Sequence, residues 1–489
     1  MTTDAGHEDL LLKVVSKLRQ AAEIEQQFMC MYLYGAFSIQ KRFANHQRLP
    51  LSPAQLELTR RWASIVYSVA RQEMEHLAIV NNLLRSIGAA PYFARVNLSE
   101  KPLAGFHLGA EPLPGEARAT RAAEGAVGGT DCTQLLPVPH DFRFDRFDFE
   151  AARRWTCMEA ANCETLLAGG GDHFADWCFA RKSAQPAAAP PGSVEPGTIQ
   201  DLYHELEELV AQLPDTAFVN GAGAQVTIEQ QYDIYVFPVT DHASARQAMR
   251  LITEQGEGTD APPTYPSHYY RFYDIVREWE RPENRPLLAS WDVLPNPHRD
   301  QIQIPYTKRV YELFNDAYET LLIMLTGLYA TQNQNPAGYP YFGPALGMEA
   351  FAPFMTMVIR SLAEVLVQLR ATDGQNGKAV RVGPGFEISP QLGADLRQPY
   401  SDGPHGLAGR NLKPQFANID EITRRVEALS ENLRALIESH EKAPVVEPEL
   451  ADWVQQRMQY IQANAQRIAI NLRRIYQQNV FSGFQTVGY

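Results

Sequence analysis

The sequence contains no long hydrophobic run. None of its 489 residues lies in an uninterrupted apolar stretch of about 18, the length that a membrane-spanning helix needs. The first residues also lack the basic start and apolar segment of a secretory signal peptide. These absences predict that the protein has no membrane partner, and we expect a cytoplasmic location.

Cysteine is also scarce. The chain has an odd number of cysteines and no C-x-x-C pair; they are Cys30, Cys132, Cys157, Cys163 and Cys178. This spacing gives neither a disulfide framework nor a zinc or redox motif. In a long chain the pattern predicts a reducing compartment without structural disulfides. We therefore expect Cys157 and Cys163 to be packing thiols.

Positive charge is in deficit, with 44 Lys and Arg against 57 Asp and Glu and a net charge of −13. Nucleic-acid-binding surfaces are basic, so we expect no nucleic-acid partner. The hydrophobic share of 45% and the charged share of 21% are typical of a globular protein with a large core.

Residues 61–88 carry a helical apolar stripe that is interrupted by one carboxylate and one imidazole. Steps of four and three residues give Trp62, Val66, Val69, Glu73, His76, Val80, Leu83 and Ile87. Residues three apart share one side of a helix, so Glu73 and His76 can face one site. Glu-x-x-His on an inward face is the ligand unit of carboxylate-bridged dimetal bundles. The alternative is a solvated glutamate beside a hydrogen-bonded core histidine.

The same helix has recognisable capping residues at both ends. Ser52 and Pro53 form a cap and a first-turn proline, Gln55 completes a capping box, and Gly88 suits the C-terminal cap. This predicts a helix long enough for a bundle.

A second stripe over residues 8–42 places Glu25 among apolar side chains. Two consecutive long helices that each bury a carboxylate predict a metal-binding helix pair, antiparallel because the connection is short. Glu23 and Glu75 fall off the stripes, and we expect both to be solvated bystanders.

Residues 89–149 are rich in proline and glycine, which predicts an irregular segment without regular elements. Long irregular segments beside a site are often functional. We therefore expect a lid that forms one wall of a substrate pocket, with Phe93, Phe106 and His107 as substrate contacts. An ornamental or oligomer-forming loop is the alternative.

Further acids occur on later helices. Residues 149–167 predict a short helix on which Glu159 forms a hydrogen-bonded pair with Asn162 near the surface; a ligand role is the alternative. The same alternative stays open for three acids of the following helices, Glu205, Glu207 and Glu254.

Two more ligands are predicted where one helix ends and the next begins. A helix over 244–258 ends in a glycine-rich turn that carries Glu257. Ser267 then caps a helix whose apolar stripe starts at His268, the arrangement already seen around His76. A β-hairpin is expected within residues 217–239, before the helix over 244–258.

At this point several blocks resemble the ferritin-like domain of the iminophenyl-pyruvate dimer synthase family, which the violacein and rebeccamycin pathways use. The blocks are AAEIEQQFMCMYLYGAFSI, ARQEMEHLAIVNNLLRSIGAAP, TIQDLY, EQGEG, SHYYRFYDIV, RVYELFNDAYETLLIMLTGLY and RVGPGFEI. The resemblance implies a non-heme iron site on a helical bundle, in enzymes that couple imines of aromatic 2-oxo acids oxidatively. It matches the family's motifs at Glu25, Glu73, His76, Glu257 and His268. No second Glu-x-x-His occurs, so one or two ions stay open.

These observations predict a mainly all-α chain, with a ferritin-like bundle over residues 1–300, the lid within 89–149, and a C-terminal helical region over 301–489. The expected function is a non-heme iron oxidoreductase, with manganese as the other metal. It would use O2 or peroxide on a small, aromatic, amino-acid-derived metabolite in secondary metabolism. No catalytic residue is assigned, and a homo-oligomer stays open. The alternatives are a metal-assisted hydrolase and a non-catalytic ferritin-like metal-binding scaffold.

Overall fold

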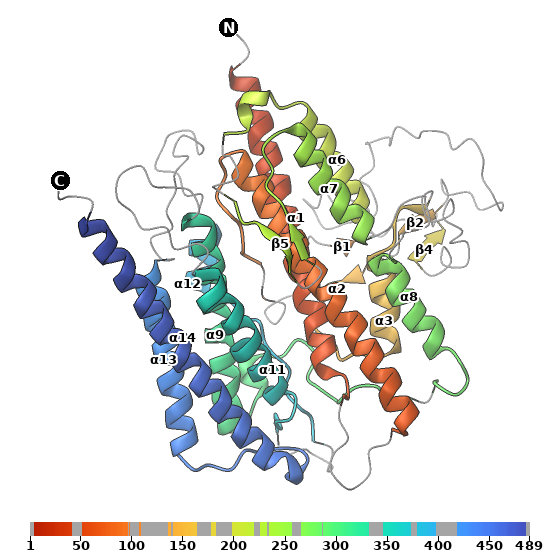
Figure 1. Ribbon diagram of the computed structural model, residues 1–489. Helices are drawn as coiled ribbons and strands as arrows, with labels where there is room; N and C mark the ends of the chain where they lie inside the picture. The colour runs from red at the N-terminus through yellow and green to blue at the C-terminus, as the bar shows by residue number, and fades with distance from the viewer. Residues whose placement is uncertain are drawn as a thin grey trace.

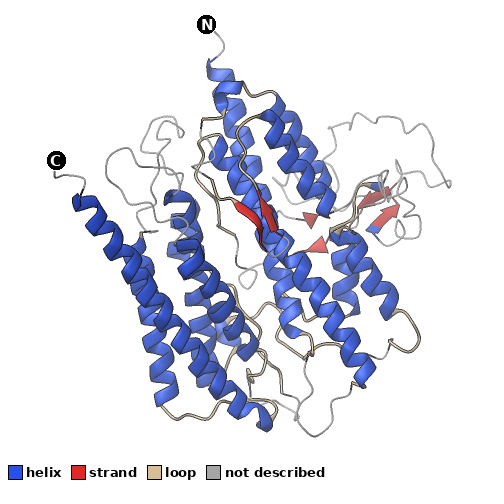
Figure 2. Cartoon of the chain, viewed as in Figure 1, coloured by secondary structure: helices blue, strands red, loops and turns tan. Residues whose placement is uncertain are grey.

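The computed structural model describes residues 4–41, 51–95, 97, 107–108, 135–137, 140–163, 178–181, 198–219, 225–231, 234–256, 266–285, 287–331, 346–372, 379–397 and 418–485. Helices dominate these residues, and the strands are short and few (Figure 2). The predicted all-α class is confirmed.

Two groups of helices lie side by side (Figure 1). The first group comes from the N-terminal part of the chain: α1 (Asp4–Ser38), α2 (Pro53–Ser86), α3 (Phe149–Met158), α6 (Ile199–Ala211), α7 (His242–Gly256) and α8 (His268–Trp279). The second group follows: α9 (Pro305–Thr331), α11 (Arg360–Leu366), α12 (Pro390–Arg397), α13 (Ile419–Glu438) and α14 (Ala451–Gln485). Two π-helical segments, Gly347–Phe351 and Phe354–Ile359, precede α11. The predicted domain division at residue 300 stays a prediction.

The start and end of α2 follow the local chemistry of the sequence. The Ser52 hydroxyl accepts a hydrogen bond from the backbone N–H of Gln55, and the Gln55 side-chain oxygen accepts one from the backbone N–H of Ser52. Pro53 lies in the first turn. Gly88 has a φ of 84°, the left-handed conformation in which glycine commonly ends a helix. The helix packs along α1, as the short connection predicts (Figure 1).

Three small antiparallel ladders occur among the described residues, together with three short 3-10 helices, Asp215–Ala217, Arg299–Gln301 and Pro448–Leu450. β5 (Ile228–Gln231) pairs with β6 (Ile234–Val236) in the expected hairpin. β1 (His107–Leu108) pairs with β3 (His140–Asp141), and β2 (Leu135–Pro137) pairs with β4 (Phe179–Arg181). The prediction that residues 89–149 hold no regular element was therefore wrong. Pairing partners far along the chain support strands that are too short for a sequence pattern.

Aromatic packing brings α3 and α8 against α1. Tyr32 of α1 packs on Trp155 of α3 and Phe272 of α8, with ring centroids 5.1 and 4.9 Å apart. Gly35 makes the approach feasible, because a Cβ at this position would overlap the Trp155 ring. The α3 and α8 helices are thus held where their ends reach the centre of the bundle.

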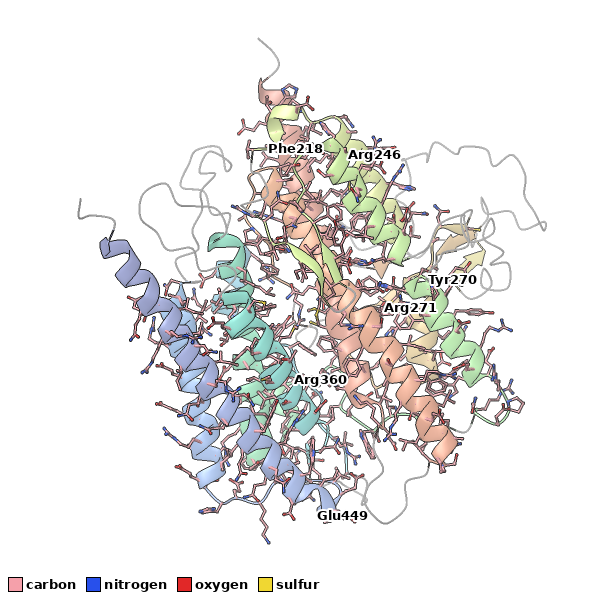
Figure 3. All side chains as sticks on the ribbon, in the orientation of Figure 1. Phe218, Arg246, Tyr270, Arg271, Arg360 and Glu449 are labelled. Carbon is pink, nitrogen blue, oxygen red and sulfur yellow. A yellow bond between two sulfur atoms is a disulfide. The ribbon has the colours of Figure 1, made fainter. Side chains whose placement is uncertain are left out.

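The second group of helices packs on α1 and α2. Gln26 of α1 donates to the Tyr318 hydroxyl of α9 at 2.9 Å, and the Tyr329 hydroxyl of α9 donates to the carbonyl of Ala78 at 2.8 Å. Arg360 of α11, labelled in Figure 3, lies over the Tyr67 ring of α2 at 5.4 Å. None of the described helices is long and apolar enough to cross a membrane.

Cys157 and Cys178 form a disulfide across 21 residues, and Cys163 is disulfide-bonded as well. The prediction of packing thiols at Cys157 and Cys163 was therefore wrong. Cys30 is buried and free, so an odd number of cysteines is compatible with disulfides elsewhere in the chain. The expected cytoplasmic location loses its support from cysteine usage and stays a prediction.

Candidate metal centre

Five ionisable side chains meet inside the first group of helices. Their exposed fractions are 2% for Glu25, 2% for Glu73, 1% for His76, 1% for Glu159 and 0% for His268. They come from α1, α2, the residue after α3, and the start of α8. Groups of this kind are rarely buried together unless a counter-charge compensates them.

Glu73 stands between the two histidines. Its Oε2 lies 3.1 Å from Nδ1 of His76, and its Oε1 lies 3.0 Å from Nδ1 of His268. The cluster therefore divides into two groups, Glu25–Glu73–His76 and Glu73–Glu159–His268, in each of which one ligand atom per residue lies within 4.8 Å of the others. One carboxylate with an oxygen in each group is the geometry of a bridging ligand.

The remaining carboxylates close each group on its outer side. Oε2 of Glu25 lies 3.4 Å from Nδ1 of His76, and Oε1 of Glu159 lies 3.7 Å from Nδ1 of His268. The two imidazole rings are roughly stacked with centroids 5.4 Å apart. Helical periodicity explains why α2 supplies both Glu73 and His76, since residues three apart share one face.

A glutamine faces the far nitrogen of each histidine. Nε2 of His76 lies 2.8 Å from Oε1 of Gln255, and Nε2 of His268 lies 3.1 Å from Oε1 of Gln72. An amide oxygen only accepts, so in both rings Nε2 donates. Nδ1 is then the nitrogen that is left for a metal, in the orientation that outer partners usually fix for a ligating histidine.

A tyrosine holds each outer carboxylate. The Tyr203 hydroxyl of α6 donates to Oε1 of Glu25 at 2.5 Å, and the Tyr32 hydroxyl of α1 donates to Oε1 of Glu159 at 2.5 Å. Burial, together with the neighbouring carboxylates, raises the pKa of both tyrosines well above the usual value. Both hydroxyls therefore keep their protons and act as donors.

Burial also shapes the titration of the cluster itself. It raises the pKa of Glu25 to about 6, although the hydrogen bond and charge of His76 oppose the shift. Burial lowers the pKa of His76, but Glu25 and Glu73 outweigh it and raise that pKa well above the usual value. Glu73 and Glu159 raise the pKa of His268 against burial in the same way. Without a metal, protons thus supply the positive charge of the cluster.

The cluster fits a pair of divalent cations. Oε1 of Glu73 and Nδ1 of His268 are buried and have no hydrogen-bond partner, although they face each other at 3.0 Å. Two ligand atoms that each lie about 2.0–2.2 Å from one ion are separated by roughly 3 Å, so an ion would satisfy both atoms. Carboxylate and imidazole donors together suit iron or manganese.

Residues 18–277 match the family model described as Ferritin-like, which covers more than half of the chain. The chain belongs to the ferritin-like family. This family assignment and the helical cluster agree, because bundles of this kind hold their metals between carboxylates and histidines of facing helices.

Two curated relatives of this ferritin-like chain are similar over most of its length. Dichlorochromopyrrolate synthase from Lentzea aerocolonigenes is 25% identical over 77% of this chain and 36% of its own. A 2-imino-3-(indol-3-yl)propanoate dimerase from Chromobacterium violaceum is 24% identical over 73% of this chain and 32% of its own. The chain thus spans about a third of the length of these relatives. The resemblance to the dimer synthase family is confirmed.

A solved structure is similar as well. The crystal structure of a ferritin-like protein from Caulobacter vibrioides aligns with a TM-score of 0.39 and 18% identity, covering 66% of this chain and 88% of that chain.

The structure brings together four of the five predicted ligands of this ferritin-like centre: Glu25, Glu73, His76 and His268. Glu257 lies outside the described residues. The expected pair of Glu159 with Asn162 was wrong, because Glu159 accepts from Tyr32 while Asn162 donates to Gln200 at 2.6 Å. The α3 helix ends at Met158, so Glu159 turns inward as its cap residue.

The other acids left open by the sequence lie apart from the cluster. Glu205 pairs with Lys17 at 2.7 Å, Glu207 pairs with Arg246 at 2.9 Å, and Glu254 is exposed. The structure therefore gives none of these three glutamates a place among the side chains of the cluster.

Glu75 corrects another expectation. We expected solvation, but Glu75 is 1% exposed, and Glu23 is half-buried. The α7 helix and the β5–β6 hairpin both pack against α2, so α2 is buried on more than one face. Burial raises the pKa of Glu75, while His76, the Tyr235 backbone and the Gln255 side chain oppose that shift. A single apolar stripe could not reveal this second buried face.

The partners of the cluster were missed by sequence reasoning. Tyr32 and Tyr203 lie on apolar stripes, where a tyrosine is indistinguishable from a core residue. Gln72 and Gln255 lie within two of the blocks that resemble the family, but no spacing on their helices gives either glutamine a role. Only the convergence of helices from distant parts of the chain assigns them a place.

The proposed lid is only partly described. Phe93 is buried and packs against Tyr329 of α9, with ring centroids 5.7 Å apart. Phe106 and the side chain of His107 lie outside the described residues. The lid over residues 89–149 and its three substrate contacts stay predictions.

Proposed function

We propose that this chain is a non-heme iron oxidoreductase that holds two ions, one in each group of the cluster, with Glu73 as the shared ligand. The observation that carries the proposal is the position of Glu73, whose two oxygens face different histidines at 3.1 and 3.0 Å. A single-ion site would not need a carboxylate turned to both sides. Manganese is the alternative metal for the same donors.

The substrate class is suggested by the names of the two relatives. One dimerises 2-imino-3-(indol-3-yl)propanoate and the other makes dichlorochromopyrrolate. We propose that this chain acts on a small, aromatic, amino-acid-derived metabolite in secondary metabolism, with O2 or peroxide as the oxidant. Oxidative coupling of two imines is the reaction that these names favour.

The residues of the chain have distinct tasks in such a centre. When bound, an iron pair supplies a redox centre that exchanges electrons with O2 or peroxide. Glu73 keeps the two positions adjacent, and the outer carboxylates Glu25 and Glu159 balance positive charge that water cannot screen in a buried site. The glutamines keep Nδ1 of each histidine pointing inward.

Metal content and spectra of the purified protein test the proposal. We expect about two iron ions per chain and an absorption change when O2 or peroxide is added to the anaerobic ferrous protein. Glu73→Gln should lose both ions, whereas Glu207→Gln, which breaks only a partly exposed ion pair with Arg246, should keep them.

The outcomes separate the candidate functions. Bound metal that does not respond to either oxidant would favour the metal-assisted hydrolase or the non-catalytic scaffold. A protein that binds neither iron nor manganese would refute the metal centre itself. If the bound metal responds to an oxidant, turnover of an aromatic imine tests the substrate class, measured as product formed against oxidant consumed.

A further inference from the structure

The two halves of the cluster differ in where their ligands lie on the helices. Glu25, Glu73 and His76 are interior residues of the long helices α1 and α2. Glu159 is the cap residue after the ten-residue helix α3, and His268 is the first residue of α8. Helix ends open locally at a lower free energy than helix interiors, so the second half needs additional support.

That support lies directly beside it. A small buried cluster, separate from the main core, contains Cys178, Ala160, Ala161, Cys163, Tyr269 and Tyr273, with Cys157 and Tyr270 packed against it. The Cys157–Cys178 disulfide lies within this group, which we name the disulfide cluster. Figure 3 labels Tyr270 at the start of α8, the end that carries His268.

The disulfide cluster flanks both ligands along the chain. Cys157 and Ala160 bracket Glu159, whose amide donates to the carbonyl of Trp155 at 3.1 Å. Tyr269 follows His268 directly and is 1% exposed. One packed unit thus joins the end of α3 to the beginning of α8.

We infer that the Cys157–Cys178 disulfide positions Glu159 and His268, and that the second metal position of the centre depends on the disulfide being formed. Cys157 and Cys178 are positioning residues, because they act on the ligands through the chain ends that they hold. The inference rests on the proposed two-ion centre. It adds that the second ion binds tightly only when the disulfide is formed.

The first half does not share this dependence. Its three ligands are fixed by the packing of α1 on α2. Tyr203 of α6 donates to Oε1 of Glu25, the oxygen that does not face His76. In the second half, Tyr32 holds the same oxygen of Glu159 that faces His268. A shift of the α3 end would therefore change the distance between Glu159 and His268 directly.

Reduction supplies the test. A water-soluble trialkylphosphine converts an S–S bond to two thiols and is itself oxidised to the phosphine oxide, with water providing the oxygen and both protons. It also reduces the disulfide of Cys163, so the Cys157→Ser/Cys178→Ser variant is the arm that isolates the Cys157–Cys178 bond. Mn²⁺ is the probe, because this hard ion prefers oxygen and nitrogen donors to the thiolates that reduction exposes. Equilibrium dialysis measures its stoichiometry, and electron paramagnetic resonance reports whether two bound ions are coupled.

We expect the untreated protein to bind two Mn²⁺ ions with a coupled signal. The phosphine-treated protein and a Cys157→Ser/Cys178→Ser variant should keep one ion, bind the second at least tenfold more weakly, and lose the coupled signal. Cys30→Ser, which removes the free thiol of α1, should keep both ions. Circular dichroism should show unchanged helix content in all three.

Other results overturn the inference in distinguishable ways. Two ions bound with unchanged affinity after reduction and in the double variant would show that the disulfide positions nothing. Loss of both ions in a protein that keeps its helix content would show that the effect is not confined to Glu159 and His268. No Mn²⁺ or iron bound by the untreated protein would remove the proposed metal centre, and this inference with it.

Discussion

The hydroxyl of Tyr203 donates to Oε1 of Glu25 at 2.5 Å, so one oxygen of that carboxylate is held by α6 while the other faces His76. Both groups are buried, with 1% of Tyr203 and 2% of Glu25 exposed. Glu25 therefore presents a single oxygen to the centre in a fixed direction.

Removing that hydroxyl tests this arrangement. Tyr203→Phe should leave a buried carboxylate oxygen without its donor, which typically costs about 1–3 kcal/mol. We expect lower thermal stability and weaker binding of one Mn²⁺ ion, measured by scanning calorimetry and by metal titration. Tyr235→Phe, at an exposed tyrosine, is the matched control and should change neither. Equal behaviour of the two variants would mean that the hydrogen bond does not orient Glu25.

The shared position of Glu73 predicts unequal effects within the ligand set. Glu25→Ala and His268→Ala each remove a ligand of one group only, so each should cost one ion. Glu73→Ala removes a ligand from both groups and should cost two. Metal analysis after exhaustive dialysis measures the three stoichiometries. Retention of one firmly bound ion by Glu73→Ala would argue against a bridge.

The pKa shifts predict opposite pH trends with and without metal. The pKa of Glu25 is raised from 4.5 to about 6 in the folded protein, so its contribution to stability falls as the pH rises through that interval. The pKa values of His76 and His268 are also raised in the folded protein. Their contribution to stability is therefore fully present below the usual histidine pKa and is lost as the pH rises through the raised values. These groups should make the metal-free protein less stable at pH 8 than at pH 5.

Bound metal should reverse this trend, because the ligands must release protons before they coordinate. The affinity for Mn²⁺ should therefore rise from pH 5 to pH 8. Thermal melting with chelator and with saturating Mn²⁺ at each pH measures both effects. Glu25→Gln should abolish the part of the metal-free trend between pH 4.5 and about 6. Affinity that is independent of pH would contradict proton displacement.

Glu75 is a buried carboxylate beside the centre that we do not count among the ligands. Its Oε2 has no hydrogen-bond partner, and burial raises its pKa. Glu75→Gln should keep both ions and should not lower the melting temperature at pH 8, because an amide avoids burying a charge there. Metal analysis and calorimetry of this variant decide the point. Loss of an ion would add Glu75 to the ligand set.

Local features of the sequence predicted the elements that build the first half of the centre. The caps of α2 and the positions of Glu25, Glu73 and His76 follow from helical periodicity and backbone hydrogen bonding, which act over a few residues. His268 was also predicted, because Ser267 marks a helix start and the following stripe is apolar. The family resemblance supported the same positions.

Other features depended on contacts that no short window of sequence contains. Glu159 reaches the cluster only because α3 ends at Met158 and Trp155 packs against Tyr32. The disulfide between Cys157 and Cys178 joins segments that a count of cysteines cannot pair.

By itself, then, the sequence determined the long helices, one apolar face of each, and the placement of Glu25, Glu73 and His76 on those faces, because each depends on neighbours within a few turns. Only the tertiary structure decided that Glu73 faces two histidines, that Tyr203 and Tyr32 hold the outer carboxylates, and that Glu75 is buried. These relationships require elements separated by up to about 200 residues to meet in one place. Their geometry is set by the packing of whole helices, and no local pattern encodes it.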